Sequence, residues 1–197
     1  MDYQAAKDFI VDKLREDLSE DLSYHGLHHT LDVLQTVGEL CYLENIDEYE
    51  SNLVKTAALF HDAGFIVSSQ EHEKYSCQIA SYYLPDFGYS PKEIDRINEM
   101  IMATKIPQSP KDKLGQLLCD ADLDYLGRDD FYRIGHSLYE ELKAREIVQE
   151  TSTWMDLQIN FLEQHSFFTE TNKRRRAPRK ADFLEELRRE KVDTEKK

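Results

Sequence analysis

Apolar residues recur at intervals of three to four along nearly the whole chain, which is the spacing of a helix face that packs on a core. Phe9, Ile10, Leu14 and Leu18 fit a first helix in this way, and a second helix is expected to begin near Ser23. No stretch alternates convincingly between apolar and polar positions, as a half-buried strand would. The pattern therefore predicts a chain made of helices.

Residues that cap or break helices bound the next three. A helix is predicted over 47–61, with Gly64 as a left-handed cap just past its end. Another is predicted over 72–84, and Ser90 followed by Pro91 opens a fifth helix as its N-cap and first helical residue. Further helices are predicted over 111–125, 129–147, 153–165 and, interrupted at Pro178, 168–197.

The predicted fold class is all-α, with the helices arranged as a single-domain bundle. A chain of 197 residues, 40% of them hydrophobic, can fill one sizeable core. We expect residues 1–167 to form the main helical domain and residues 168–197 to form a charged helical extension packed on it. Phe183, Leu184 and Leu187 supply the narrow apolar stripe for that packing.

The charge balance limits the partners of the chain. With 39 acidic and 25 basic residues the formal net charge is −14, so electrostatic repulsion disfavours bulk binding to nucleic acid. Segment 173–180, KRRRAPRK, is the exception, and it is either a solvated basic helix end or a contact for phosphate.

The apolar content and the cysteines bear on the compartment. No apolar run approaches the roughly 20 residues needed to cross a bilayer, and the acidic start MDYQ predicts no secretory signal. Cys41, Cys77 and Cys119 are odd in number, far apart and surrounded by apolar residues, which fits buried thiols in a reducing compartment. We expect a cytoplasmic protein with no membrane partner, and its oligomeric state stays open.

Histidine and aspartate residues stand at inward-facing positions of three separate predicted helices. His25 and His29 are four residues apart and therefore share a helix face. The doublet His61-Asp62 ends the next predicted helix, and Asp120 lies on a later one. An uncompensated buried carboxylate is costly, so these groups are expected to share a divalent ion or to form a polar network. The alternative is that the doublet caps its helix, Asp120 faces solvent and His29 is a hydrogen-bonded core residue.

Three segments, YHGLHHTLDV, LFHDAG and CDADLDYLG, resemble in order and spacing the HD-domain metal-dependent phosphohydrolases. The resemblance spans residues 24–127 and implies an all-α fold. It also implies that metal-activated water attacks the phosphate ester of a small phosphorylated metabolite or nucleotide. By this resemblance one divalent ion (manganese, iron, cobalt, nickel, zinc or magnesium) is bound, with a second ion left open. The implied metal ligands are His29, His61, Asp62 and Asp120.

The first of these segments is also similar to the YHNxxH signature of cyclic-nucleotide phosphodiesterases, in which the first histidine protonates the leaving oxygen. This similarity makes His25 the expected general acid, although Gly26 stands where that signature has asparagine. His29 is preferred to His28 as the metal ligand because it shares a helix face with His25.

Other residues are expected to act on the substrate. Asp62, besides binding the ion, is expected to help activate the attacking water. His72, Lys105 and Arg128 are candidates to neutralise the phosphate, although a lysine or arginine at a helix end also serves simply as a solvated charge. His165 is either packed among aromatic residues or part of a wall of the pocket.

Two rival functions remain open at this point. One is a cyclic-nucleotide or other phosphodiesterase, which activity on diesters but not on monoesters would distinguish. The other is a non-catalytic, metal-binding regulatory protein. A zinc protease is excluded because HGLHH has glycine where HExxH needs its glutamate base, and neither a GxSxG elbow nor a glycine-rich phosphate loop is present.

Overall fold

The computed structural model describes residues 1–195, and their side chains except at positions 152, 194 and 195. The predicted all-α fold class is confirmed, since the described residues form α-helices and short 3-10 helices and no strand. None of these helices is both long enough and apolar enough to span a membrane.

The chain divides into two compact units, Met1–Asp122 and Leu123–Lys197. This boundary lies well before the one we expected near residue 167. The reason is that helices between residues 123 and 175 pack on the charged C-terminal helix and form one unit with it. The last two residues of the expected extension lie outside the described residues.

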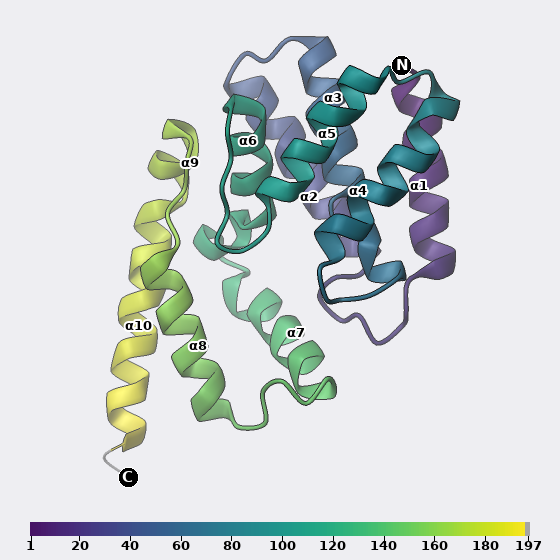
Figure 1. Cartoon of the computed structure of the whole chain (residues 1–197). Coiled ribbons are helices and arrows are strands. Elements are labelled where there is room, and N and C mark those ends of the chain that lie inside the picture. Colours follow the sequence, from purple (N-terminus) through teal and green to yellow (C-terminus); the bar gives the residue numbers. More distant parts are fainter. Residues whose placement is uncertain (196–197) are drawn as a thin grey trace. The chain divides into compact units, whose positions relative to one another are not determined.

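The first unit is a bundle built around one central helix (Figure 1). Its elements are α1 (Tyr3–Asp17), α2 (Leu27–Leu43), α3 (Glu48–Phe60), η1 (Ala63–Ile66), α4 (His72–Tyr83), η2 (Leu84–Phe87), α5 (Pro91–Ala103) and α6 (Lys113–Asp122). The central helix, α3, contacts α1, α2, α4, α5 and α6. Its side chains from Leu53 to Phe60 are nearly all fully buried, so the end of α3 delivers the residues that follow it into the interior.

The sequence signals for helix starts are largely confirmed in this unit. Ser90 accepts a hydrogen bond from the backbone of Glu93 and Glu93 reaches back to Ser90, which forms a capping box with Pro91 at the first helical position. The start of α2 differs from the prediction, because the helix begins at Leu27 and not near Ser23. His25 therefore precedes the helix that carries His29.

Gly64 does not act as the left-handed cap that we predicted, since it lies inside η1 and Gly88 is the glycine with a positive φ among the described residues. Its role is to let two backbones approach. A Cβ at position 64 would lie 1.9 Å from the carbonyl oxygen of His72 and 2.8 Å from the amide nitrogen of Ser76. The Gly64 amide donates a 2.8 Å hydrogen bond to the Ser76 hydroxyl. Because Gly64 has no side chain, the start of α4 can lie against the turn that contains His61 and Asp62.

The second unit pairs two long helices, α8 and α10, which run side by side (Figure 1). Its elements are η3 (Asp124–Gly127), α7 (Phe131–Ala144), α8 (Thr151–Gln164), α9 (Glu170–Arg175) and α10 (Ala177–Glu195). The helix break that we expected at Pro178 falls at Arg176 instead. Pro178 sits in the first turn of α10, where the missing amide hydrogen of proline costs no helical hydrogen bond.

A buried carboxylate joins η3 to α9 and to Arg176, the residue that follows α9. Asp124 is 1% exposed, and its Oδ1 accepts hydrogen bonds from Nδ2 of Asn172 at 3.1 Å and from Nε of Arg176 at 2.8 Å. Gly127 allows the same close approach, because a Cβ there would lie 2.3 Å from the Arg176 carbonyl oxygen. The charged C-terminal segment is therefore an integral part of the second unit.

Candidate metal centre

Four side chains from three segments of the first unit converge near the end of α3. His29 comes from the first turn of α2, His61 directly follows α3, Asp62 is the next residue, and Asp122 ends α6. His61 is 1% exposed and His29 6%. These polar groups are thus held in the interior, where leaving them unpaired would be costly.

The distances between these groups are those of ligands around one ion. Nε2 of His29 lies 3.2 Å from Oδ1 of Asp122 and 3.4 Å from Nε2 of His61. The ligand atoms of His29, His61 and Asp122 all lie within 4.8 Å of one another. Ligand atoms about 2.1 Å from one ion are separated by about 3.0–3.4 Å when they subtend about 90–110° at it. The group can therefore hold a divalent ion with little rearrangement.

Asp62 borders the same group from the other side. Its Oδ2 lies 3.2 Å from Nε2 of His61 and 3.5 Å from Nε2 of His29. Both imidazoles thus face two carboxylates, which makes a mixed nitrogen and oxygen donor set that could hold a divalent metal.

Neighbouring groups fix how two of these ligands point. Nδ1 of His61 lies 2.8 Å from the carbonyl oxygen of Ala58, so this nitrogen donates to it and Nε2 is the nitrogen that faces the group. Nε2 of Gln108 donates to Oδ2 of Asp122 at 3.3 Å, which leaves Oδ1 toward the histidines. This kind of support from outside the ligands is typical of built metal sites.

The structure places Asp122, and not the expected Asp120, in this group. Two residues apart on a helix are about 200° apart around its axis, so the two carboxylates point to nearly opposite sides of α6. Asp120 is 0% exposed, but its oxygens are not among the clustered ligand atoms. Periodicity could not separate the two positions, because residues 117–121 of α6 are all buried. Leu114 and Leu118 lead to Asp122 at a spacing of four residues, but Leu117 leads to Asp120 at a spacing of three, so the apolar pattern does not choose between the two aspartates.

His25 reaches the neighbourhood of the group from outside α2. Its ring centroid lies 6.1 Å from that of His29 and 4.6 Å from that of Tyr24, which is itself 4.7 Å from His29. His25 is half-buried, whereas His28 is exposed. The geometry thus agrees with the choice of His29 over His28, and the role of His25 as an acid stays a prediction.

His72 lies against the other oxygen of Asp62. Its Nε2 is 3.4 Å from Oδ1 of Asp62 and 3.6 Å from Oε1 of Glu73, and its Nδ1 lies 3.3 Å from the Ser69 carbonyl oxygen. Glu73 is buried, and sequence reasoning missed it because an acid in the first turn of a helix is usually solvent-exposed.

The two basic residues predicted to meet the phosphate have different surroundings. Lys105 is exposed in the loop after α5, and together with the nearer Lys74 it lowers the pKa of Glu71. Arg128 belongs to the second unit, where its guanidinium binds both carboxylate oxygens of Asp130 at 2.8 and 2.9 Å. Their contact with substrate stays a prediction. His165 also lies in the second unit and packs against Phe167, with ring centroids 4.7 Å apart.

The carboxylates control the protonation of the site. Burial by itself lowers the pKa of His61, but Asp62 and Asp122 outweigh it and hold this pKa well above the ordinary 6.5. Burial raises the pKa of Asp122, yet hydrogen bonds from His29 and His61 bring it down to about 2. Without an ion, the two carboxylates therefore favour the protonated form of His61, and an ion must displace that proton to bind.

These shifts predict opposite pH profiles for the metal-free and metal-loaded protein. The raised His61 pKa adds stability that is complete below about pH 6.5 and is lost as the pH rises through the folded-state pKa. The lowered Asp122 pKa adds stability that is lost as the pH falls from about 3.8 to about 2. We expect the unfolding temperature in EDTA to be highest between about pH 4 and 6.5. With saturating Zn²⁺ the stabilisation by metal should instead grow from pH 6 to 8, and an EDTA profile that rises over that range would contradict this assignment.

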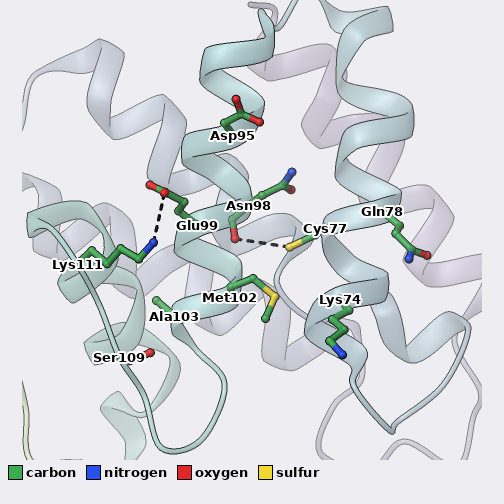
Figure 2. A pocket seen from close by; sticks show the side chains of 10 residues that line it. All are labelled: Lys74, Cys77, Gln78, Asp95, Asn98, Glu99, Met102, Ala103, Ser109 and Lys111. Carbon is green, nitrogen blue, oxygen red and sulfur yellow. Dashed lines mark hydrogen bonds and ion pairs between the residues drawn. The ribbon is translucent and has the colours of Figure 1, made fainter.

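A separate groove of about 670 Å³ lies between α4 and α5 of the first unit (Figure 2). Its lining includes Cys77, Met102 and Lys111 and none of the residues of the metal group. The Cys77 thiol donates to the backbone carbonyl of Asn98 at 3.5 Å, and burial raises its pKa to about 11. A thiol in this state is not an activated nucleophile. Cys77 therefore offers no activated nucleophile in this groove.

Comparison with known families agrees with this geometry. The family model described as the HD domain matches residues 26–124, half of the chain. This range contains every side chain of the metal group and of its supports. Comparison with curated proteins and with solved structures found no match. The helical structure brings together a histidine, a His-Asp doublet and a later aspartate, in that order along the chain. This arrangement agrees with the match of the family model over half of the chain, and the protein belongs to the HD-domain family.

Proposed function

We propose that this protein is a metal-dependent phosphohydrolase that cleaves the phosphate ester of a small phosphorylated metabolite or nucleotide. The observation that carries the proposal is the convergence of two imidazole nitrogens on two carboxylates, with each nitrogen 3.2–3.6 Å from an oxygen of both Asp62 and Asp122. His29, His61 and Asp122 would hold the ion, with Asp62 as a fourth ligand. Manganese, iron, cobalt, nickel, zinc and magnesium remain the candidate ions.

A divalent ion at this position supplies Lewis-acid polarisation of a phosphoryl oxygen and lowers the pKa of a coordinated water. The residues of the chain then have distinct tasks. Asp62 shares one oxygen with the imidazoles and presents the other toward His72, so it is placed to accept a proton from the attacking water. His72, whose Nε2 lies 3.4 Å from Oδ1 of Asp62, is the residue that would hold a phosphate oxygen.

His25 is the proposed general acid. It is half-buried, it lies beside the metal group and it is not one of the clustered ligands. An imidazole in that position can protonate the leaving oxygen without being tied to the ion.

The test is hydrolysis of a panel of phosphomonoesters, nucleotides and cyclic mono- and dinucleotides by metal-stripped protein resupplied with each candidate ion. We expect His25→Ala to keep one bound ion per chain and to lose about 10²–10⁴-fold in kcat, the usual size of a general-acid contribution. His28→Ala is the matched control, because His28 is exposed and should leave both quantities unchanged. Loss of the ion in His25→Ala would make this residue a ligand instead.

The rival functions give other outcomes in the same panel. Turnover of cyclic or linear diesters without turnover of monoesters would make the protein a phosphodiesterase. A stoichiometric ion with no turnover of any substrate would contradict the hydrolase proposal and favour a metal-binding regulatory protein.

A further inference from the structure

Three aromatic rings form a triangle beside the metal group. Phe65 stacks on His25 with ring centroids 4.3 Å apart and planes 19° apart. The same phenyl ring lies 4.3 Å from the ring of His72 at 33°. The two imidazole centroids are 6.2 Å apart, well under the sum of the two stacking distances, so both imidazoles lean around one phenyl ring. Phe65 therefore contacts both histidines in this arrangement.

Phe65 is itself fixed to the turn that carries the metal ligands. It lies in η1, three residues after Asp62, and its amide donates to the Asp62 carbonyl oxygen at 3.0 Å. The preceding residue, Gly64, is held by the Ser76 hydroxyl. The same short segment therefore positions both Asp62 and the phenyl ring. The phenyl ring in turn packs against both imidazoles.

The stacking on Phe65 adds to the other contacts that the two histidines make. His25 precedes α2, and its ring also lies against that of Tyr24, with ring centroids 4.6 Å apart. The contacts of His72 to Asp62 and to the Ser69 carbonyl oxygen are 3.4 and 3.3 Å long, beyond the usual range for strong hydrogen bonds. Aromatic stacking at 4.3 Å supplies a directional contact that limits how such rings rotate.

We propose that Phe65 is a positioning residue that sets the imidazoles of His25 and His72 against Asp62, and so links the two histidines into one unit of the active site. This inference rests on the proposed function for the roles of His25 and His72. It predicts that Phe65 acts on anion binding through the histidines and has little effect on the ion itself. A displacement of the order of 1 Å at a reacting group can cost about 100-fold in rate, so even a small loss of ring order should be measurable.

The first measurement is made on the metal-free protein and needs no activity. Ring currents from Phe65 should shift the ring-proton NMR signals of His25 and His72, which are assigned with the His25→Ala and His72→Ala variants. We expect Phe65→Leu to move both sets of signals toward those of solvent-exposed histidine and Phe65→Tyr to retain them. Signals of His25 and His72 that do not move in Phe65→Leu would overturn the proposal.

The second measurement is the affinity of inorganic phosphate for the Zn²⁺-loaded protein by calorimetry. We expect Phe65→Leu to weaken phosphate binding about 10-fold while the Zn²⁺ affinity changes less than about 2-fold, and Phe65→Tyr to restore wild-type affinity. In the His25→Ala/His72→Ala background, the same Phe65→Leu change should have no further effect. Phe87→Leu is the matched control, because Phe87 packs on Phe9 in this unit and on none of these histidines.

The outcomes separate this inference from the proposed function. An equal effect of Phe65→Leu with and without the histidines, or NMR shifts that move while phosphate affinity stays constant, would overturn the positioning role and leave the hydrolase proposal standing. Failure of the Zn²⁺-loaded wild-type protein to bind phosphate or to hydrolyse any ester would refute the proposed function. The inference would then fall with it, even if the NMR signals still reported the ring triangle.

Discussion

Replacing Asp122 with asparagine is expected to weaken the binding of a divalent ion by more than about 100-fold. Asp122 supplies the carboxylate oxygen that lies 3.2 Å from His29 and 3.6 Å from His61, so the change removes a negative charge from the centre of the donor set. Loss of groups that merely support a ligand typically costs 10–100-fold in affinity, and loss of a ligand should exceed that range. Calorimetric titration of Zn²⁺ or Mn²⁺ into EDTA-treated protein measures the effect.

Asp120→Asn is the matched control for this prediction. It makes the same chemical change two residues earlier on α6, at a carboxylate that lies outside the clustered ligand atoms. We expect Asp120→Asn to keep one ion per chain with an affinity within about 10-fold of wild type. If Asp120→Asn loses the ion while Asp122→Asn keeps it, the assignment of the aspartate ligand is wrong and the sequence-based choice was correct.

Among glycine-to-alanine substitutions in the first unit, Gly64→Ala is expected to disturb the structure most. The added carbon would lie 1.9 Å from the His72 carbonyl oxygen and 2.7 Å from the His72 carbonyl carbon, so the start of α4 must move away. Overpacking of this kind costs about 1–3 kcal/mol of the free energy of unfolding, and occasionally more. The same movement should draw His72 away from Asp62. Urea unfolding at fixed pH, with and without Zn²⁺, measures both effects.

Gly38→Ala provides the control for the glycine prediction. A Cβ at Gly38, inside α2, would meet only the end of the Lys55 side chain at 3.7 Å, an ordinary contact. Alanine in a helix interior is favoured over glycine by about 0.8–1.0 kcal/mol, so this variant should be more stable than wild type. Equal behaviour of the two alanine variants would show that position 64 does not need glycine.

Local signals in the sequence determined the helices. Each helix has its own apolar spacing and many have a recognisable start, as at Ser90-Pro91 and at Asp47, whose side chain accepts the hydrogen bond of the Glu50 amide. These features act over one or two helical turns, so they can be read without knowing the fold. His29 and the His61-Asp62 doublet were also identified correctly as neighbours. Their segments place these polar groups at inward-facing positions of apolar helices, which is why the sequence pointed to a shared site.

The tertiary structure alone decided the remaining features, because each depends on residues distant in sequence. Whether Asp120 or Asp122 meets the histidines depends on how α6 is rotated against α2 and α3, and a helix buried all round gives no periodic signal for that rotation. The need for glycine at position 64 arises from the start of α4, eight residues further on. The placement of Phe65 between His25 and His72 arises from three separate segments. Local spacing thus determined which elements form and which groups carry the chemistry, while packing decided which of those groups meet.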